Sequence, residues 1–165
     1  MDEVVLGFSG VFVGAAVSIV TTWIMAKNNR SLQASDFANQ KTERQREFQR
    51  KTLLELQDVA NELDRSVGLT FRADHQFYKE NKEWGKGLIP EGLSEKDRLN
   101  RVRFLTLVER VSDDKLRTRL KEFNKLLLNI QRAKTYDEAL AHLKEATQES
   151  GATREYMGEV LRSQY

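Results

Sequence analysis

The sequence predicts an all-α protein with an N-terminal transmembrane helix, a polar stalk helix and a cytoplasmic helical bundle. The chain has 165 residues and one proline, and its frequent Leu, Lys, Glu, Arg and Gln favour long helices. One uncharged apolar segment lies near the N-terminus, and the later apolar residues recur at intervals of three and four. We therefore expect a transmembrane anchor over 1–26, a basic polar stalk over 27–47 and the bundle over 48–165.

The first element is the uncharged segment from Val4 to Ala26. As a helix, its 23 residues span about 34 Å, enough to cross a hydrocarbon core about 30 Å thick. A cleaved signal peptide would begin with a basic region, whereas Asp2 and Glu3 precede this apolar run. Trp23 fits an aromatic anchor at the membrane surface. The segment is therefore predicted to be a retained transmembrane helix.

Charge is distributed unevenly around this segment. Residues 27–51 carry seven Lys or Arg against three acids, whereas the chain from residue 52 onward has 20 of each. The positive-inside rule then predicts an outside N-terminus and a cytoplasmic bundle at a bacterial inner membrane. The five basic residues nearest the apolar segment are Lys27, Arg30, Lys41, Arg44 and Arg46. We expect them to attract anionic lipid headgroups. The alternative is that they serve only as a stop-transfer flank. The balanced bundle predicts no nucleic-acid partner.

Small residues recur along one face of the predicted transmembrane helix. The small residues are Gly7, Gly10, Gly14, Ser18 and Thr22. Residues of this size let two helix backbones approach closely in a membrane. The repeat predicts homo-oligomerisation. The general frequency of glycine in membrane helices is the alternative explanation, and the repeat alone does not distinguish a dimer from a ring that lines a pore.

The stalk is polar on almost every side and is predicted to be helical from about Asp36. A packed helix then runs from about Phe48 to about Lys82. Its apolar residues form a core-facing seam, made of Leu53, Leu56, Ala60, Leu63 and Val67 and widened by Leu54 and Val59.

The glycines and the proline of residues 85–92 break the chain before three further helices. Ser94 to Asp97 resembles a capping box and predicts a helix that ends at about Val111. Ser112-Asp-Asp opens the next helix, whose apolar face is Leu116, Leu120, Phe123, Leu127 and Ile130. Thr135 caps the last helix, which we expect Gly151 to interrupt.

Residues suited to catalysis are few. There is no cysteine and no glycine-rich phosphate loop, and neither His75 nor His142 follows an arginine at the spacing of the helical ribonuclease motif. Asp74, His75 and Tyr78 form the most reactive-looking cluster, but neighbours on a helix point about 100° apart. His75 is therefore expected to be a surface histidine.

Two further positions have structural explanations. Asp113 and Asp114 suit the first turn of a helix, where the helix dipole favours acids. Trp84 is expected to close the end of the bundle rather than to be an exposed recognition residue. We predict no catalytic residue, no metal site and no cofactor, and therefore a protein that is not an enzyme.

Four segments together resemble small bacterial single-pass membrane proteins of unassigned function, which have an N-terminal transmembrane helix and a helical cytoplasmic domain. The segments are residues 6–14, 46–58, 78–85 and 110–117. In layout only, the chain also resembles membrane effectors of phage defence, such as the pore protein that accompanies one class of RNA-targeting CRISPR nucleases. The resemblance implies a topology and no catalytic residues.

These expectations define two functional hypotheses. The first is a homo-oligomeric membrane protein that perturbs the membrane or forms a pore in bacterial antiviral defence. The second is a membrane-anchored scaffold that recruits a cytoplasmic partner. Either hypothesis predicts contact with membrane lipids, other copies of the chain, and a protein or signal whose identity the sequence does not give.

Overall fold

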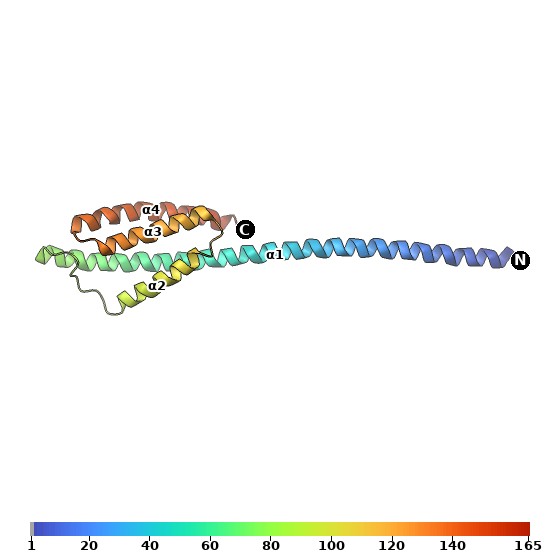
Figure 1. The fold of residues 1–165 in the computed structure, drawn as a ribbon, viewed down its shortest axis with the longest axis horizontal. Coiled ribbons are helices and arrows are strands. Elements are labelled where there is room, and N and C mark those ends of the chain that lie inside the picture. Colours follow the sequence, from blue (N-terminus) through green and yellow to red (C-terminus); the bar gives the residue numbers. More distant parts are fainter. Residues whose placement is uncertain (1) are drawn as a thin grey trace. The chain divides into compact units, whose positions relative to one another are not determined.

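A computed structural model describes the backbone of residues 2–165 and the side chains of residues 22, 23, 25–30, 32, 33 and 35–165. The described chain forms four helices and no strand (Figure 1). They are α1 (Asp2–Asn81), α2 (Leu93–Val108), α3 (Asp114–Arg132) and α4 (Tyr136–Arg162). The prediction of an all-α protein with a helical bundle is confirmed.

The chain divides into two compact units, residues 1–45 and residues 46–165. Helix α1 contributes to both units and is helical throughout, so the prediction that the stalk becomes helical only near Asp36 is wrong. Residues 15–67 contain neither glycine nor proline, and a formed helix gains one hydrogen bond for each residue that it adds. Nothing in this stretch stops the helix.

The predicted transmembrane segment, 4–26, lies mostly outside the residues whose side chains are described; only Thr22, Trp23, Met25 and Ala26 are described. Within the described part of the chain, no helical stretch has both the length and the apolarity that a membrane crossing requires.

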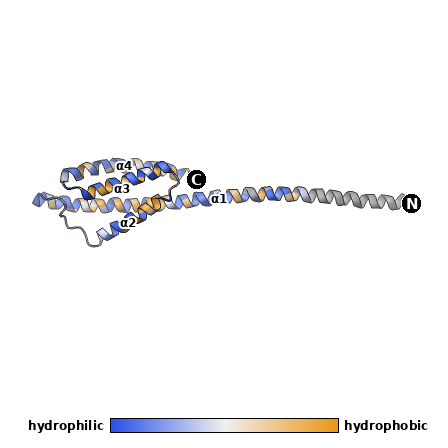
Figure 2. Ribbon diagram, in the orientation of Figure 1, coloured by the Kyte–Doolittle hydropathy of each residue, from blue (hydrophilic) through white to orange (hydrophobic). Residues whose placement is uncertain are grey.

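The second unit is built around one hydrophobic core. From α1, Leu53, Leu56 and Leu63 are each 0% exposed, which confirms the predicted seam. Leu54 does not belong to it, because its side chain is 47% exposed. The other three helices and the loop residue Val111 supply the rest of the core, which in chain order is Phe104, Leu107, Val108, Val111, Leu116, Leu120, Phe123, Leu126, Leu127, Ile130, Ala146 and Met157. Figure 2 shows hydrophobic and hydrophilic residues interspersed along each of these helices, as expected of amphipathic helices.

Helix α4 begins at the predicted cap, Thr135, whereas α3 is capped by Asp113, which the sequence predicts to lie in the first turn of that helix. The Asp113 carboxylate accepts a hydrogen bond from the Leu116 backbone N–H at 2.6 Å, and the Thr135 hydroxyl accepts one from the Glu138 N–H at 3.2 Å. Each cap satisfies an N–H group that has no partner within its own helix.

Helix α2 begins differently from the prediction. Its N-cap is Gly92, with φ of 75° and no side-chain cap, so the capping box predicted at Ser94 is wrong. The chain enters the helix through a left-handed conformation, which glycine adopts at little steric cost. The helix also ends at Val108 rather than Val111, although Val111 is buried in the core.

Helix α4 runs through Gly151 without a break, so the predicted interruption is wrong. One glycine inside a helix costs only about 1 kcal/mol relative to alanine. The flanking residues Ser150, Thr153 and Met157 are buried against the bundle, and this packing outweighs that cost.

Candidate interaction surface

The most reactive-looking cluster of the sequence lies in an aromatic group at the C-terminal end of α1. The Tyr136 ring stacks on His75 and on Tyr78, with ring centroids 5.1 Å apart in both pairs. Trp84 meets Phe71 edge-on at 5.4 Å. The prediction that Trp84 closes the bundle is confirmed. His75, predicted to be a surface histidine, is half-buried, and its stacking partner Tyr136 lies 61 residues away in the sequence.

Asp74 holds the loop that follows α1. Its carboxylate accepts a hydrogen bond from the Gly87 backbone N–H at 2.8 Å. A Cβ at position 87 would lie 2.4 Å from the Ala73 backbone, so only glycine permits this close approach. Asp74 and Gly87 thus fasten the loop to the helix, a structural role that neither residue reveals in the sequence.

The other sequence candidates also have structural partners. Tyr156 donates a hydrogen bond to the Asp113 carboxylate at 3.3 Å. Burial, followed by the negative charge of Asp113, raises the pKa of the Tyr156 phenol. His142 is half-buried, with Nδ1 3.9 Å from the Glu145 carboxylate. In the part of the chain that is described, no three acidic or histidine side chains are grouped to hold a metal ion.

A polar network that the sequence does not suggest joins α2 to α3. The Arg101 guanidinium donates to Asn124 at 2.7 Å, to Gln131 at 2.9 Å and to Asp97 at 3.0 Å. The Arg101 and Asp97 side chains are each 14% exposed. The spacing of four residues between Asp97 and Arg101 is a signal in the sequence for an ion pair. The sequence gives no such signal for the two amides, because they belong to another helix. The network fixes how α2 sits on the bundle.

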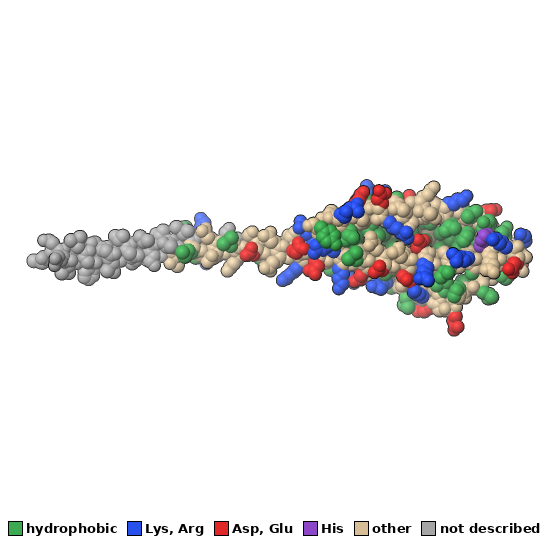
Figure 3. Space-filling model, turned by 180° about the vertical axis from the view of Figure 1, so that it is seen from behind, with side chains coloured by type: hydrophobic (Ala, Val, Ile, Leu, Met, Phe, Trp, Pro, Cys, Tyr) green, Lys and Arg blue, Asp and Glu red, His purple; other side chains and the backbone are tan. Residues whose placement is uncertain are grey.

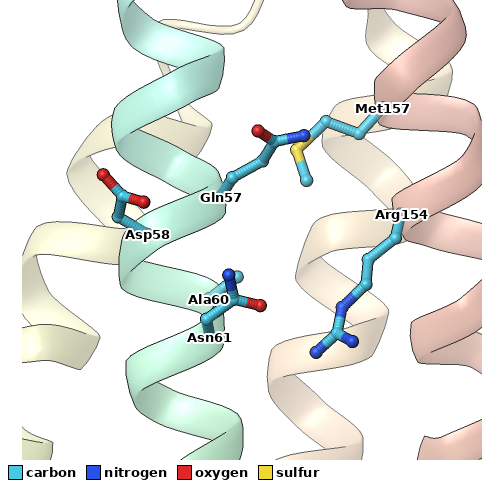
Figure 4. A pocket seen from close by; sticks show the side chains of 6 residues that line it. All are labelled: Gln57, Asp58, Ala60, Asn61, Arg154 and Met157. Atoms are coloured by element: carbon cyan, nitrogen blue, oxygen red, sulfur yellow. The ribbon is translucent and has the colours of Figure 1, made fainter.

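A shallow cleft of about 300 Å³ lies between α1 and α4. Its residues are Gln57, Asp58, Ala60 and Asn61 from α1 and Arg154 and Met157 from α4 (Figure 4). In this view the Gln57 and Met157 side chains extend toward each other from facing helices. The Arg154 guanidinium pairs with Asp64 at 2.8 Å, so its charge is used to join the two helices.

The outer face of α2 departs from ordinary bundle packing because it exposes apolar side chains. Leu99, Val102 and Leu105 are 53%, 57% and 41% exposed. Their spacing of three places them on one side of the helix, and we call them the outer α2 face. The opposite side carries the buried Phe104, Leu107 and Val108.

This helix is therefore apolar on two sides, only one of which is covered within the chain. The preceding loop adds Leu88, which is 92% exposed, and Ile89, which is 44% exposed. Figure 3 shows that other hydrophobic side chains also reach the surface of the second unit among charged ones.

The predicted membrane-associated residues lie in the first unit or next to it. The side chains of Gly7, Gly10, Gly14 and Ser18 are outside the described residues, and Thr22 is exposed. The five predicted membrane-surface bases are all exposed on α1. The Lys27 ammonium lies 5.6 Å from the centre of the Trp23 ring.

Comparison with known proteins gives no relative: no family model, no curated protein and no solved structure matches the chain. The function must therefore be inferred from the residues of the chain itself.

Proposed function

We propose that this protein is a single-pass protein of the bacterial inner membrane that homo-oligomerises and binds a cytoplasmic protein through its helical bundle. The outer α2 face is the observation that carries the binding role. Single exposed apolar residues are ordinary on protein surfaces, but Leu99, Val102 and Leu105 form a continuous stripe on one helix. A helix of a partner, laid along this stripe, would remove it from water.

The uncharged segment 4–26 and its flanks support the membrane anchor. The segment belongs to a helix that starts at Asp2, and the first charged residue after it is Lys27. Trp23 is 66% exposed and lies beneath the Lys27 ammonium. An exposed aromatic ring beside a lysine suits the headgroup level of a bilayer.

Continuity of α1 narrows which bases would reach the lipid headgroups. In a helix that crosses the membrane at 4–26, Lys27 and Arg30 lie within about one turn of its end. Lys41 and Arg44 are 15 and 18 residues beyond Ala26, or about 22–27 Å along the axis. That exceeds the screening length of about 8 Å at physiological salt. We therefore assign the headgroup role to Lys27 and Arg30 and not to Lys41, Arg44 or Arg46.

A photoreactive amino acid at Val102 tests the binding role. In cells it should form discrete adducts with another protein, whereas the same group at Lys125 should not. Lys125 is a matched control because its side chain is also exposed, at 68%, but lies on α3. Equal adducts at both positions, or none at Val102, would contradict binding through the outer α2 face.

A cell fractionation experiment tests the anchor. The full chain should stay in the membrane pellet at alkaline pH and should be released by detergent. A chain without residues 1–26 should appear in the supernatant. Release of the full chain by alkaline buffer alone would contradict a membrane-crossing segment.

A membrane-perturbing or pore-forming effector of phage defence is the second candidate. The small-residue repeat from Gly10 to Thr22 favours it, because close helix packing allows a ring. Induced expression together with the activating signal should then depolarise the inner membrane, and Gly14→Leu should abolish the effect while Lys125→Ala preserves it. If the protein is a scaffold instead, neither the parent chain nor the Gly14→Leu variant should depolarise the membrane.

A further inference from the structure

The two halves of α2 are held to the bundle in different ways. The buried residues of this helix, Phe104, Leu107 and Val108, all lie near its C-terminal end. No residue between 93 and 103 is buried, and Figure 1 shows the N-terminal end of α2 standing clear of α1. Helix α2 is therefore anchored in the hydrophobic core at one end only.

Polar contacts hold the N-terminal half of α2. The Lys96 ammonium pairs with the Glu62 carboxylate of α1 at 2.5 Å, and both side chains are exposed. From α3, Gln131 donates a hydrogen bond to Asp97 at 3.4 Å and accepts one from Arg101 at 2.9 Å. Exposed ion pairs and single hydrogen bonds contribute less to stability than buried apolar side chains do. This half of the helix is therefore only weakly restrained.

A crevice of about 190 Å³ separates the same half of α2 from α1. Its lining combines the first turns of α2 with a stretch of α1, and the residues are Glu62, Arg65, Ser66, Leu69, Leu93 and Lys96. Leu69 and Leu93 come from the two facing helices, and both are half-buried. Apolar side chains on both walls favour closing of the crevice, because contact between them would remove them from water.

Unpaired polar atoms gather at this contact between α1 and α2. Within the described part of the chain, four buried side-chain polar atoms have no hydrogen-bond partner. One of them is the hydroxyl of Ser66, a residue that lines the crevice and is 3% exposed. Two others, on Asp97 and Asn100, belong to the N-terminal half of α2. Because an unpaired buried polar group is costly, this contact is not the most favourable one that the two helices can make.

We propose that α2 is hinged at its C-terminal end and that its N-terminal half closes onto α1, so that Leu93 packs against Leu69. The buried Phe104 lies 11 residues from Leu93, or about 16 Å along the helix. A rotation of about 10° about Phe104 therefore moves the first turn of α2 by about 3 Å. Gly92, with φ of 75°, connects this moving end to the preceding loop.

The hydrogen bonds of Gln131 oppose this closure. Closure draws Asp97 toward α1 and away from the Gln131 amide on α3, whose bond to it is already long at 3.4 Å. The Lys96 and Glu62 side chains are long and exposed, so their ion pair persists in both positions. The open position is thus favoured by the contacts with α3 and the closed position by burial of Leu69 and Leu93.

The hinge gives the outer α2 face two positions relative to α1. A partner that contacts both this face and α1 binds the two positions with different affinity, and it therefore shifts the balance between them. This consequence rests on the proposed function, whereas the hinge itself does not depend on any partner.

Distances between spin labels test the hinge in the full, cysteine-free chain, diluted with unlabelled chain in detergent. The pair Asp58→Cys/Glu95→Cys joins α1 to the moving end of α2, and Asp58→Cys/Glu109→Cys joins α1 to the anchored end. All three side chains are exposed, so the labels should not disturb the core. The first pair should give a broad distribution or two maxima and the second a single narrow one. Equal widths would overturn the proposal.

A disulfide that forms only on closure tests the second position. Its two thiols, in Leu69→Cys/Leu93→Cys, must bring their Cβ atoms to about 4 Å. Oxidation should be slow in this variant and at least about threefold faster when Gln131→Ala is added, the shift expected when the open position loses a hydrogen bond. Lys125→Ala, an exposed change on the same helix, should leave the rate unchanged.

The pair Leu69→Cys/Leu99→Cys distinguishes closure from general loosening, because Leu99 lies on the outer α2 face. Its oxidation should remain slow with and without Gln131→Ala. Equal acceleration of both pairs would show that α2 only detaches, and no acceleration of the first pair would show that Gln131 does not hold α2 open. Immediate oxidation of the first pair in the chain that retains Gln131 would show that the helices already touch there. Each of these three results would overturn the proposal.

Discussion

Two parts of α1 have the same helical backbone but differ in the burial of their apolar side chains. In the bundle, Leu53, Leu56 and Leu63 are 0% exposed, because three other helices cover their side of α1. Between residues 22 and 45, Leu32 and Phe37 are 61% and 71% exposed. The difference shows that local sequence is enough to make a helix, whereas burial of its apolar side chains requires a partner. For the bundle that partner is in the chain, and for residues 22–45 we expect it outside.

The largest expected effect comes from exchanging leucine for alanine inside the bundle. Leu56→Ala should lower the free energy of unfolding by about 2–5 kcal/mol, since it leaves a cavity in the core. Phe37→Ala is the matched change in the exposed segment and should leave that free energy unchanged, because Phe37 is 71% exposed. Urea unfolding measures the free energy of unfolding of both variants. Equal losses of stability would contradict the distinction between the two parts of α1.

The next largest expected loss of stability comes from removing a helix cap in the bundle. Asp113→Ala should cost about 0.5–2 kcal/mol, because it removes an N-cap hydrogen bond. The same change also removes the acceptor of the Tyr156 hydroxyl. Asp114→Ala is the control, since its side chain is 88% exposed and pairs with Arg117 at the surface. A larger loss for Asp114 in urea unfolding would show that Asp113 is not the functional cap.

Substitution of two glycines of the bundle by alanine should change the stability of the protein in opposite directions. Gly151 lies inside α4, and a Cβ added there would meet open space, so Gly151→Ala should raise stability by about 0.5–1 kcal/mol. Gly92 has φ of 75°, so Gly92→Ala should lower stability because a side chain is strained there. Thermal unfolding of both variants measures the signs, and a loss in Gly151→Ala would contradict its placement in a regular helix.

The smallest expected effect is a pH dependence at high pH. Folding raises the pKa of the Tyr156 phenol through burial and the Asp113 charge, so the folded protein favours the neutral phenol. This contribution to stability is complete below the unfolded pKa of about 10 and is lost as pH rises through the higher folded pKa. Tyr156→Phe should therefore lose less stability than the parent between about pH 9 and pH 11. An identical loss in both proteins would contradict the shift.

Local patterns predict the helices of the bundle better than its contacts. The seam at Leu53 to Val67 and the cap at Thr135 follow from spacing and from adjacent residues, and the structure confirms them. The start of α3 is predicted to within one residue, with Asp113 as its cap rather than part of its first turn. The loop held by Asp74 and Gly87 depends on residues 13 apart.

Other features depend on contacts over still longer distances. Arg101 binds amides 23 and 30 residues away, and Tyr136 stacks on His75 from another helix. No periodicity encodes such pairings. The sequence misleads at Gly151 for a related reason: the packing of its neighbours, and not its own propensity, decides that α4 continues.

Topology in intact cells tests the membrane anchor, on which the proposed function depends, most directly. Single cysteines can be introduced into the cysteine-free chain at Asp2 and at Ser163 and exposed to a thiol reagent that does not cross membranes. We predict that Asp2→Cys is labelled in intact cells, whereas Ser163→Cys is labelled only after the cells are lysed. Labelling of Ser163→Cys in intact cells, with Asp2→Cys protected, would contradict the cytoplasmic placement of the bundle.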